Sequence, residues 1–183
     1  MLTTQTTFNL GTVLLLTGVG LPSVLLMTGV ALPPTVHAPS YYTARLSGAV
    51  ANIMSGSAEF GRPQGQNGDR PFVITLGAHG EQGAVVFTKW DGLRPGPGKY
   101  RISPEPSGDG IQALVVTGTP EHPTGVFRGR RGTLTITSSD QQRITGRFSM
   151  DAEGYLASDP ENEDRALVIE GELEAVASRS QKG

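Results

Sequence analysis

The feature of this chain that most constrains its fold is a five-residue pattern that occurs three times. The copies are residues 46–50 (LSGAV), 144–148 (ITGRF) and 169–173 (IEGEL). In each copy, apolar residues and a central glycine alternate with small, polar or charged residues. Because successive side chains of a β-strand point to opposite faces of a sheet, the pattern predicts three strands that bury one face.

The second and third copies predict two strands with oppositely charged outer faces. Arg143 and Arg147 lie on the polar side of the strand at residues 143–150. Glutamates occupy every second position of the strand that follows, at Glu170, Glu172 and Glu174. If the two strands pair antiparallel, arginines lie opposite glutamates, and a one-residue slip would bury the glutamates at a large cost. Exposed cross-strand pairs contribute about 0.2–1 kcal/mol each, so they set the register more than the stability.

The central glycines of the pattern also need a physical reason, because glycine weakens the interior of a strand. Gly146 and Gly171 fall on the apolar, inward side. We expect either a tight bend or an aromatic ring, that of Phe148 or Phe60, packed over the bare backbone. Since the first and last strands carry the same pattern, we also expect them to pair and close the sheet.

Alternating segments and chain breakers elsewhere predict an all-β protein. The 25 glycines and 13 prolines favour a turn-rich β-protein over a helical one. The strand spacing is that of an antiparallel β-sandwich or flattened barrel of about eight or nine strands, preceded by an apolar N-terminal leader. The predicted strands are residues 45–53, 71–76, 84–90, 99–102, 111–117, 126–128, 133–137, 143–150 and 167–175, with a turn at residues 129–132.

The N-terminal leader differs in composition from the rest of the chain. No Lys, Arg, Asp or Glu precedes Arg45, and residues 10–32 are apolar apart from Thr, Ser and Gly. Residues 36–38 (VHA) resemble a signal-peptidase site. We expect residues 1–38 to be a cleaved signal peptide or, as the alternative, a membrane anchor, and residues 39–183 to be a single secreted or periplasmic β-domain. A misassigned start codon would be a third explanation of the leader.

The net charge and the absence of cysteine exclude several kinds of partner and site. A formal charge of −2 gives no general attraction to nucleic acid or to anionic membranes. We therefore predict no nucleic-acid partner, and membrane association only if the leader is uncleaved. Without cysteine the chain forms neither disulfides nor thiolate metal sites, and it lacks the residue that carries a bacterial lipid anchor.

The sequence carries no recognisable catalytic or metal-binding motif. Its three histidines, His37, His79 and His122, have neither the HxH nor the HxxxH spacing of metal ligands, and no GxSxG motif occurs. The acidic segment at residues 159–164 lacks the spacing and the glycine of a calcium loop, which favours a solvated connection over a Ca²⁺ site. We predict no catalytic residues, no metal site and no cofactor.

Two groups of residues are candidates for binding. Trp90 and Tyr100 could supply the aromatic surfaces of a sugar-binding site, although a lone tryptophan in a small β-domain belongs more often to the core or its rim. Arg128, Arg130 and Arg131 are predicted to form a compact basic turn. Such a turn could hold a carboxylate or phosphate, although a turn that only increases solubility is the simpler interpretation.

The C-terminal strands resemble those of a group of known domains. The segments that carry the resemblance are GTLTIT at 132–137, RITGRFSMDA at 143–152 and ALVIEGELEA at 166–175. They are similar to the C-terminal half of uncharacterised secreted bacterial β-sandwich domains with I-x-G-x-F-type strands, and the similarity extends over residues 45–176. Met150 stands where these domains usually have an aromatic residue, and the cysteine of their lipid anchor is absent. The resemblance implies an exported domain without known activity and transfers no functional residue.

These observations favour an exported, non-enzymatic β-domain that acts in binding or in cell-envelope structure, with an unknown protein or small-molecule partner. One alternative is a small-ligand protein that holds a lipid or carbohydrate in a cavity between sheets; another is an exported hydrolase without a recognisable motif. A filled core with an exposed apolar patch would favour the first function, and an apolar cavity with convergent polar groups the second. A cleft that groups histidine with carboxylates would favour the hydrolase.

Overall fold

The computed structural model describes residues 40–64, 68, 70–77, 83–105, 109–119, 121–159 and 164–178. All of them belong to the unit His37–Gly183. The predicted leader with its cleavage site, His37, His79 and residues 160–163 of the acidic segment lie outside the described residues.

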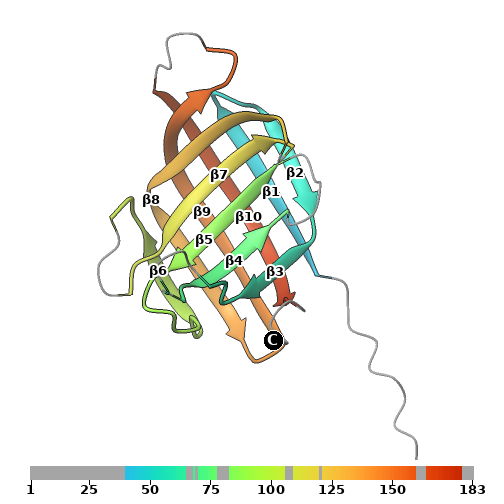
Figure 1. Ribbon diagram of the computed structural model, residues 1–183, viewed down its shortest axis with the longest axis vertical. Helices are drawn as coiled ribbons and strands as arrows, with labels where there is room; N and C mark the ends of the chain where they lie inside the picture. Colours follow the sequence, from blue (N-terminus) through green and yellow to red (C-terminus); the bar gives the residue numbers. More distant parts are fainter. Residues whose placement is uncertain are drawn as a thin grey trace, which may run out of the picture. The chain divides into compact units, whose positions relative to one another are not determined.

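Every regular element in the described part of the chain is a β-strand, which confirms the predicted all-β class (Figure 1). No helix among these residues is long and apolar enough to span a membrane. The ten strands are β1 (Tyr41–Gly48), β2 (Asn52–Gly56), β3 (Ala58–Gly61), β4 (Phe72–Leu76), β5 (Ala84–Lys89), β6 (Gly98–Ile102), β7 (Gln112–Gly118), β8 (Pro123–Ser139), β9 (Arg143–Leu156) and β10 (Arg165–Ala177).

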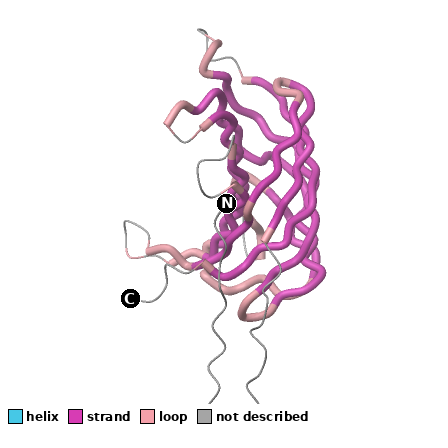
Figure 2. The backbone as a smooth tube through the Cα atoms, turned by 90° about the vertical axis from the view of Figure 1, so that its right-hand side faces the viewer, coloured by secondary structure: helices cyan, strands magenta, loops and turns pink. Residues whose placement is uncertain are grey.

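The ten strands form one sheet that closes on itself. β10 pairs antiparallel with β9 along one edge. Along its other edge it pairs antiparallel with β1 and, at Val176 and Ala177, parallel with β3. From β3 the antiparallel pairing continues through β4, β5, β7 and β8 and returns to β9. Of the two predicted architectures, the structure is therefore the barrel, and its strands curve around a common interior in Figure 2.

The predicted pairing of the first and last strands is confirmed. In the ladder between β1 and β10, Ala44 lies opposite Gly171 and Leu46 lies opposite Ile169. β2 extends the sheet on the other side of β1. Two copies of the alternating pattern therefore lie next to each other in the sheet and bury the same face.

The register of β10 is the one that the charge pattern predicts. Its glutamates point outward, and each has an arginine on a neighbouring strand. The facing or ion-paired residues are Arg147 with Glu172, Arg143 with Glu174, and Arg45 with Glu170. A one-residue slip of β10 would remove these pairs and turn three carboxylates into the core, so the alternative register is strongly disfavoured.

An aromatic ring lies over Gly171, the inward glycine of β10, as the sequence predicts, whereas the nearest groups to the Cβ position of Gly146 are the Thr135 carbonyl and Ile136. A Cβ atom added to Gly171 would lie 2.7 Å from Cζ of Phe148 and would also meet the backbone of Thr43 on β1. The Phe148 ring packs edge-on against Phe87, with ring centroids 5.1 Å apart and ring planes at 65°. Glycine at this position therefore lets β1 and Phe148 approach the β10 backbone closely.

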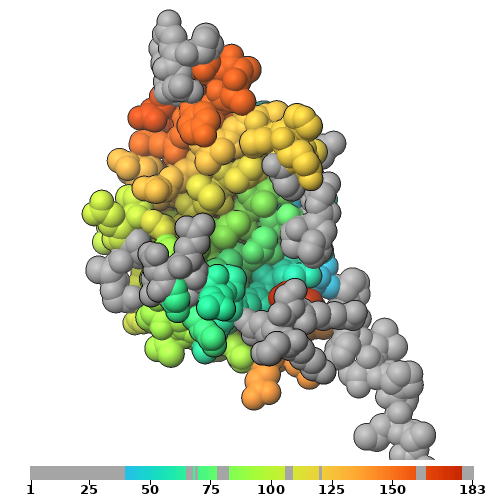
Figure 3. All heavy atoms as spheres, in the orientation of Figure 1, coloured from blue at the N-terminus to red at the C-terminus, as the bar shows by residue number. Residues whose placement is uncertain are grey.

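The side chains on the inner side of the closed sheet form one hydrophobic cluster to which all ten strands contribute. Its largest fully buried members include Tyr42, Phe87 and Phe127. On the outside, the side chains of β5, β7 and β8 make a continuous surface in Figure 3. Because apolar side chains occupy the interior, a ligand site is expected at the surface or the rim of the sheet.

Two strand boundaries near the N-terminal end differ from the prediction. Residues 45–53, predicted as one strand, are divided between β1, which ends at Gly48, and β2, which begins at Asn52. Gly48 has φ +104°, a conformation that glycine adopts without strain, so the chain turns inside a segment that has strand-like alternation. β3 has no counterpart among the predicted strands, because the small residues before it obscure its alternation.

The predicted turn at residues 129–132 is wrong, because these residues lie inside β8, which is 17 residues long. The strand is irregular at a bulge between Gly129 and Arg131. A Cβ atom on Gly132 would lie 2.5 Å from Cβ of Met150 on β9. The two glycines therefore allow a bulge and a close strand contact, and they do not reverse the chain.

Replacing Gly171 by alanine should destabilise the protein by about 1–3 kcal/mol, the usual cost of extra volume in a packed region. The new methyl group would overlap Phe148 and the β1 backbone. Urea unfolding followed by far-UV circular dichroism measures the change.

Gly96→Ala is the matched control, since no described atom lies within 4 Å of its Cβ position. It should stay within about 0.5 kcal/mol of the wild-type stability. Equal stabilities of the two variants would contradict the packing of Phe148 on Gly171.

Candidate binding cleft beside strand β6

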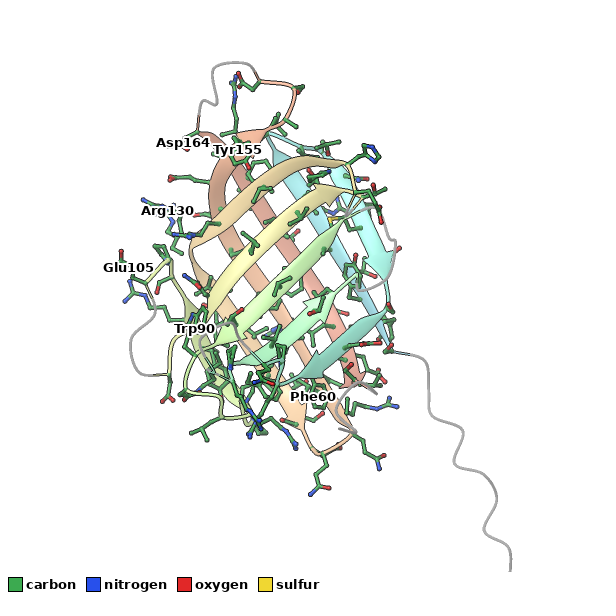
Figure 4. The ribbon with its side chains drawn as sticks, viewed as in Figure 1. Phe60, Trp90, Glu105, Arg130, Tyr155 and Asp164 are labelled. Atoms are coloured by element: carbon green, nitrogen blue, oxygen red, sulfur yellow. The ribbon has the colours of Figure 1, made fainter. Side chains whose placement is uncertain are left out.

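A polar cleft borders the part of β8 where that strand changes its partner. One edge of β8 pairs with β7 at residues 123–128 and with β6 at residues 132–136. Residues 103–105, 109 and 110, which lie between β6 and β7 in the chain, form one wall of a cleft of about 650 Å³. Figure 4 shows Trp90, Glu105 and Arg130 on this flank of the protein. The residues that line the cleft are Lys99, Tyr100, Arg101, Ser103, Pro104, Glu105, Asp109, Gly110 and Arg130.

Main-chain hydrogen bonds fix the two ends of the connection from β6 to β7. The Ile111 amide donates to the Arg101 carbonyl at 2.9 Å, and the Ser103 amide donates to the Ile111 carbonyl at 3.1 Å. Ile102 and Ile111 are both buried, and they form a parallel bridge. The wall of the cleft is therefore attached to the hydrophobic core at its base.

Trp90 is exposed, which corrects the preferred expectation that it belongs to the core or its rim. The residue is 56% exposed, because Lys89 takes the last inward position of β5 and the next residue leaves the strand on the outside. The indole Nε1 donates a hydrogen bond to Oε1 of Gln112 at 3.1 Å. Nε2 of Gln112 donates in turn to the carbonyl of Pro104, a cleft residue, at 2.8 Å. Two hydrogen bonds thus hold the exposed ring next to the cleft.

Tyr100 lies in the cleft as a fixed part of its wall. Its side chain is half-buried and packs against the core cluster, and its hydroxyl donates a hydrogen bond to the carbonyl of Gly96 at 2.9 Å. The structure therefore brings Tyr100 and Trp90, the two aromatic candidates of the sequence, to the same flank. Trp90 offers the more exposed ring of the two.

Lys89 is a buried cation beside the cleft, and it was not among the candidate residues predicted from the sequence. It is only 4% exposed, in phase with the buried Val85 and Phe87 on the inner side of β5. Its ammonium group forms an ion pair with Asp91 and lies 3.6 Å from Oδ1 of Asp109, which lines the cleft. Since lysine is rarely buried unless it is paired, these carboxylates explain its position. The alternation of residues 84–90 in the sequence already places Lys89 on the same side of the strand as Val85 and Phe87.

The environment of Asp91 favours its ionised form. Burial raises the pKa of Asp91, but three favourable interactions outweigh it and leave the pKa below its ordinary value. They are the hydrogen bond from Lys89, the hydrogen bond from the Leu93 amide, and the charges of Lys89 and Arg62. Asp91 therefore stays charged as the counter-ion of the buried ammonium group.

The three arginine candidates do not form the compact basic turn that the sequence predicts. They lie along β8, with Arg128 before its bulge, Arg130 in it and Arg131 after it. Arg130 lines the cleft, with its Nε 3.0 Å from Oε2 of Glu153. Arg128 lies opposite Glu153 in the ladder, and Arg131 forms an ion pair with Asp151. Of these three side chains, the cleft includes only that of Arg130.

The described residues contain no group of three or more histidine and carboxylate side chains that could hold a metal ion. His122 is exposed in the turn before β8, where its amide donates to Oγ1 of Thr119 at 3.2 Å. Asp159, at the beginning of the acidic segment, forms an ion pair with Arg165 at 2.6 Å. The polar groups of the cleft are cationic, carboxylate and hydroxyl side chains, which suits them to hydrogen bonding with a ligand.

Comparison with known proteins finds no relative: no family model, no curated protein and no solved structure matches this chain. The resemblance to secreted bacterial β-domains therefore stays a prediction.

Replacing Asp91 by asparagine should destabilise the protein by about 1–3 kcal/mol at pH 7, because the buried Lys89 loses its nearer carboxylate. Folding lowers the pKa of Asp91. The ionised carboxylate therefore contributes to the free energy of unfolding above about pH 4, and this contribution is lost as the pH falls through the folded-state pKa. Urea unfolding at pH 7 and at pH 3 should show a difference between wild type and variant that shrinks at the lower pH.

Lys89→Met separates the cost of an unpaired charge from the loss of an ion pair. It removes the buried charge and keeps an apolar chain of similar length, so it should destabilise less than Asp91→Asn. An Asp91→Asn variant as stable as the wild type at pH 7 would contradict the role of Asp91 as counter-ion.

Proposed function

We propose that the protein is an exported, non-enzymatic binding protein whose ligand is a saccharide and whose binding site is the cleft beside β6, with Trp90 at its border. The observation that carries the proposal is the exposed indole of Trp90, fixed by Gln112 next to a polar cleft. Export rests on the apolar leader and its signal-peptidase-like end.

The exposed, fixed position of the Trp90 ring is thermodynamically unfavourable unless a ligand packs against the ring. A large aromatic side chain that stays in water gains little from burial, and fixing it by a hydrogen bond reduces its rotamer freedom. A ligand that covers the ring would recover this cost, because the ring is already oriented for contact. Sugar rings have apolar C–H faces that pack well on an indole, next to hydroxyl groups that need polar partners.

The cleft supplies both hydrogen-bond donors and hydrogen-bond acceptors for these hydroxyl groups. Lys99, Arg101 and Arg130 are hydrogen-bond donors, whereas Glu105 and Asp109 are acceptors. A polyhydroxylated ligand both donates and accepts hydrogen bonds, so it can use this mixture more fully than a purely apolar ligand. The apolar side chains that occupy the interior give less support to the alternative of an enclosed lipid.

The cleft also gives little support to the hydrolase alternative. Asp109 lies 3.6 Å from the Lys89 ammonium, so this carboxylate of the cleft is placed as an ion-pair partner of Lys89. The one described histidine, His122, is not among the residues that line the cleft. A net charge of −2 likewise gives no reason to add nucleic acid as a partner.

Trp90 is the only tryptophan of the chain, so its fluorescence reports directly on the proposed site. Binding of an oligosaccharide should shift its emission to shorter wavelength and protect it from quenching by acrylamide, because the ligand shields the indole from water. A glycan array identifies the ligand, and a fluorescence titration measures its Kd.

Trp90→Ala should weaken binding on the array at least about tenfold, or about 1.4 kcal/mol. Leu93→Ala is the control, since Leu93 is 61% exposed in the segment after β5 but, unlike that of Trp90, its side chain has no hydrogen bond that connects it to a cleft residue. The proposal would be wrong if no saccharide bound, or if Trp90→Ala bound as tightly as the wild type.

A further inference from the structure

We infer that the saccharide is acidic and that its carboxylate or sulfate groups are held by Lys99 and Arg101 on the β6 wall of the cleft. The inference rests on the proposed function and specifies the class of ligand for the same site. It follows from the way in which charges are matched over the outer surface of the sheet.

Outward-facing arginines on the other strands have a carboxylate partner. Each either forms an ion pair or lies directly opposite an acidic residue on the neighbouring strand. The pairs are Arg45 with Glu170, Arg128 and Arg130 with Glu153, Arg131 with Asp151, Arg143 with Glu174, Arg147 with Glu172, and Arg165 with Asp159. Such matching reduces the attraction of the sheet surface for foreign anions.

Lys99 and Arg101 depart from this pattern. They lie opposite Thr135 and Thr133 of β8, and neither forms an ion pair with a carboxylate of the described residues. Both are exposed. They are two positions apart on the same side of β6, roughly 6–7 Å along the strand. The two unmatched strand cations are therefore neighbours, and both line the cleft.

The charge balance inside the cleft favours an anion as well. Arg130 is compensated by Glu153 at 3.0 Å, and Asp109 lies 3.6 Å from the ammonium group of Lys89. Among the lining residues this leaves the charges of Lys99 and Arg101 against that of Glu105. The cleft thus carries a local positive excess on a chain whose formal net charge is −2.

The chemistry of the two cations suits oxyanions attached to a sugar. The arginine guanidinium presents a planar fork that can bind a carboxylate or sulfate through two hydrogen bonds, and the lysine ammonium adds a mobile point charge. Spacing of roughly 6–7 Å allows each cation to contact a separate anionic group of an oligosaccharide. Trp90 would provide the apolar contact beside them.

An array of matched glycans tests this inference. It contains uronate oligosaccharides with their methyl esters, sulfated oligosaccharides with their desulfated forms, and neutral oligosaccharides. We expect the carboxylated or the sulfated member of a pair to bind at least about tenfold more tightly than its uncharged counterpart, and the preferred pair distinguishes carboxylate from sulfate. The preference should decrease as salt is raised from 50 to 500 mM, because exposed charges are screened.

The double variant Lys99→Gln/Arg101→Gln should lose the preference for the acidic member, so that both members of a pair bind with about the same Kd, because glutamine still donates hydrogen bonds but carries no charge. Arg45→Gln, which removes a matched arginine on β1, separated from β6 by β8, β9 and β10, should keep the preference. Binding of the uncharged members alone, or an unchanged preference in the double variant, would overturn the inference and leave the proposed function intact. Absence of saccharide binding would instead overturn the proposed function, and the inference with it.

Discussion

The sheet closes around a position that only glycine fits, Gly171 of β10, where the β1 backbone and the Phe148 ring both approach closely. β10 pairs with β9 on one edge and with β1 and β3 on the other, so it is the strand at which the two ends of the sheet meet. Three strands approach closely there, and a side chain at position 171 would occupy the space that the ring needs. Since the ring also contacts Phe87 on β5, the same residue links the meeting point to the opposite part of the core.

Closure around a filled interior determines where a functional site can form. The inward positions are used for the hydrophobic cluster, so chemistry is left to the rim and to the connections. Lys89 occupies the last inward position of β5, so the next residue, Trp90, points outward. The Lys89 ammonium also lies 3.6 Å from Oδ1 of Asp109, a residue of the cleft. The bulge of β8 is followed by a change of partner from β7 to β6, next to which the cleft lies. The packing of the closed sheet therefore determines the position of the polar cleft.

Strict alternation made most of the fold predictable, and small residues made the rest unpredictable. The period-2 patterns of β4, β5, β9 and β10 were sufficient to predict strands. The charged outer faces of β9 and β10 predicted their register, and the pattern shared by β1 and β10 predicted closure. Glycine has several uses that look alike in a sequence: Gly48 turns the chain, whereas Gly129 and Gly132 allow a bulge and a close contact within a strand. Tyr100, Trp90 and Arg130 were identifiable as candidates by residue type. Their grouping with Lys89 depends on long-range pairing that short patterns do not encode.

The charges on the outer surface are distributed unevenly, so that a protein of net negative charge has a local excess of cations beside β6. Long-range attraction follows the net charge, but it is screened within about 10 Å in salt, so recognition at contact depends on the local balance. On β9 and β10 the arginines are neutralised by glutamates of the neighbouring strand, and these pairs also fix the register, as Arg147 and Glu172 illustrate. On β6 the facing residues of β8 are threonines, so Lys99 and Arg101 have no part in register and no stabilising partner there. Charges that contribute little to the fold are free to serve in binding, and they lie on the wall of the cleft beside the exposed tryptophan.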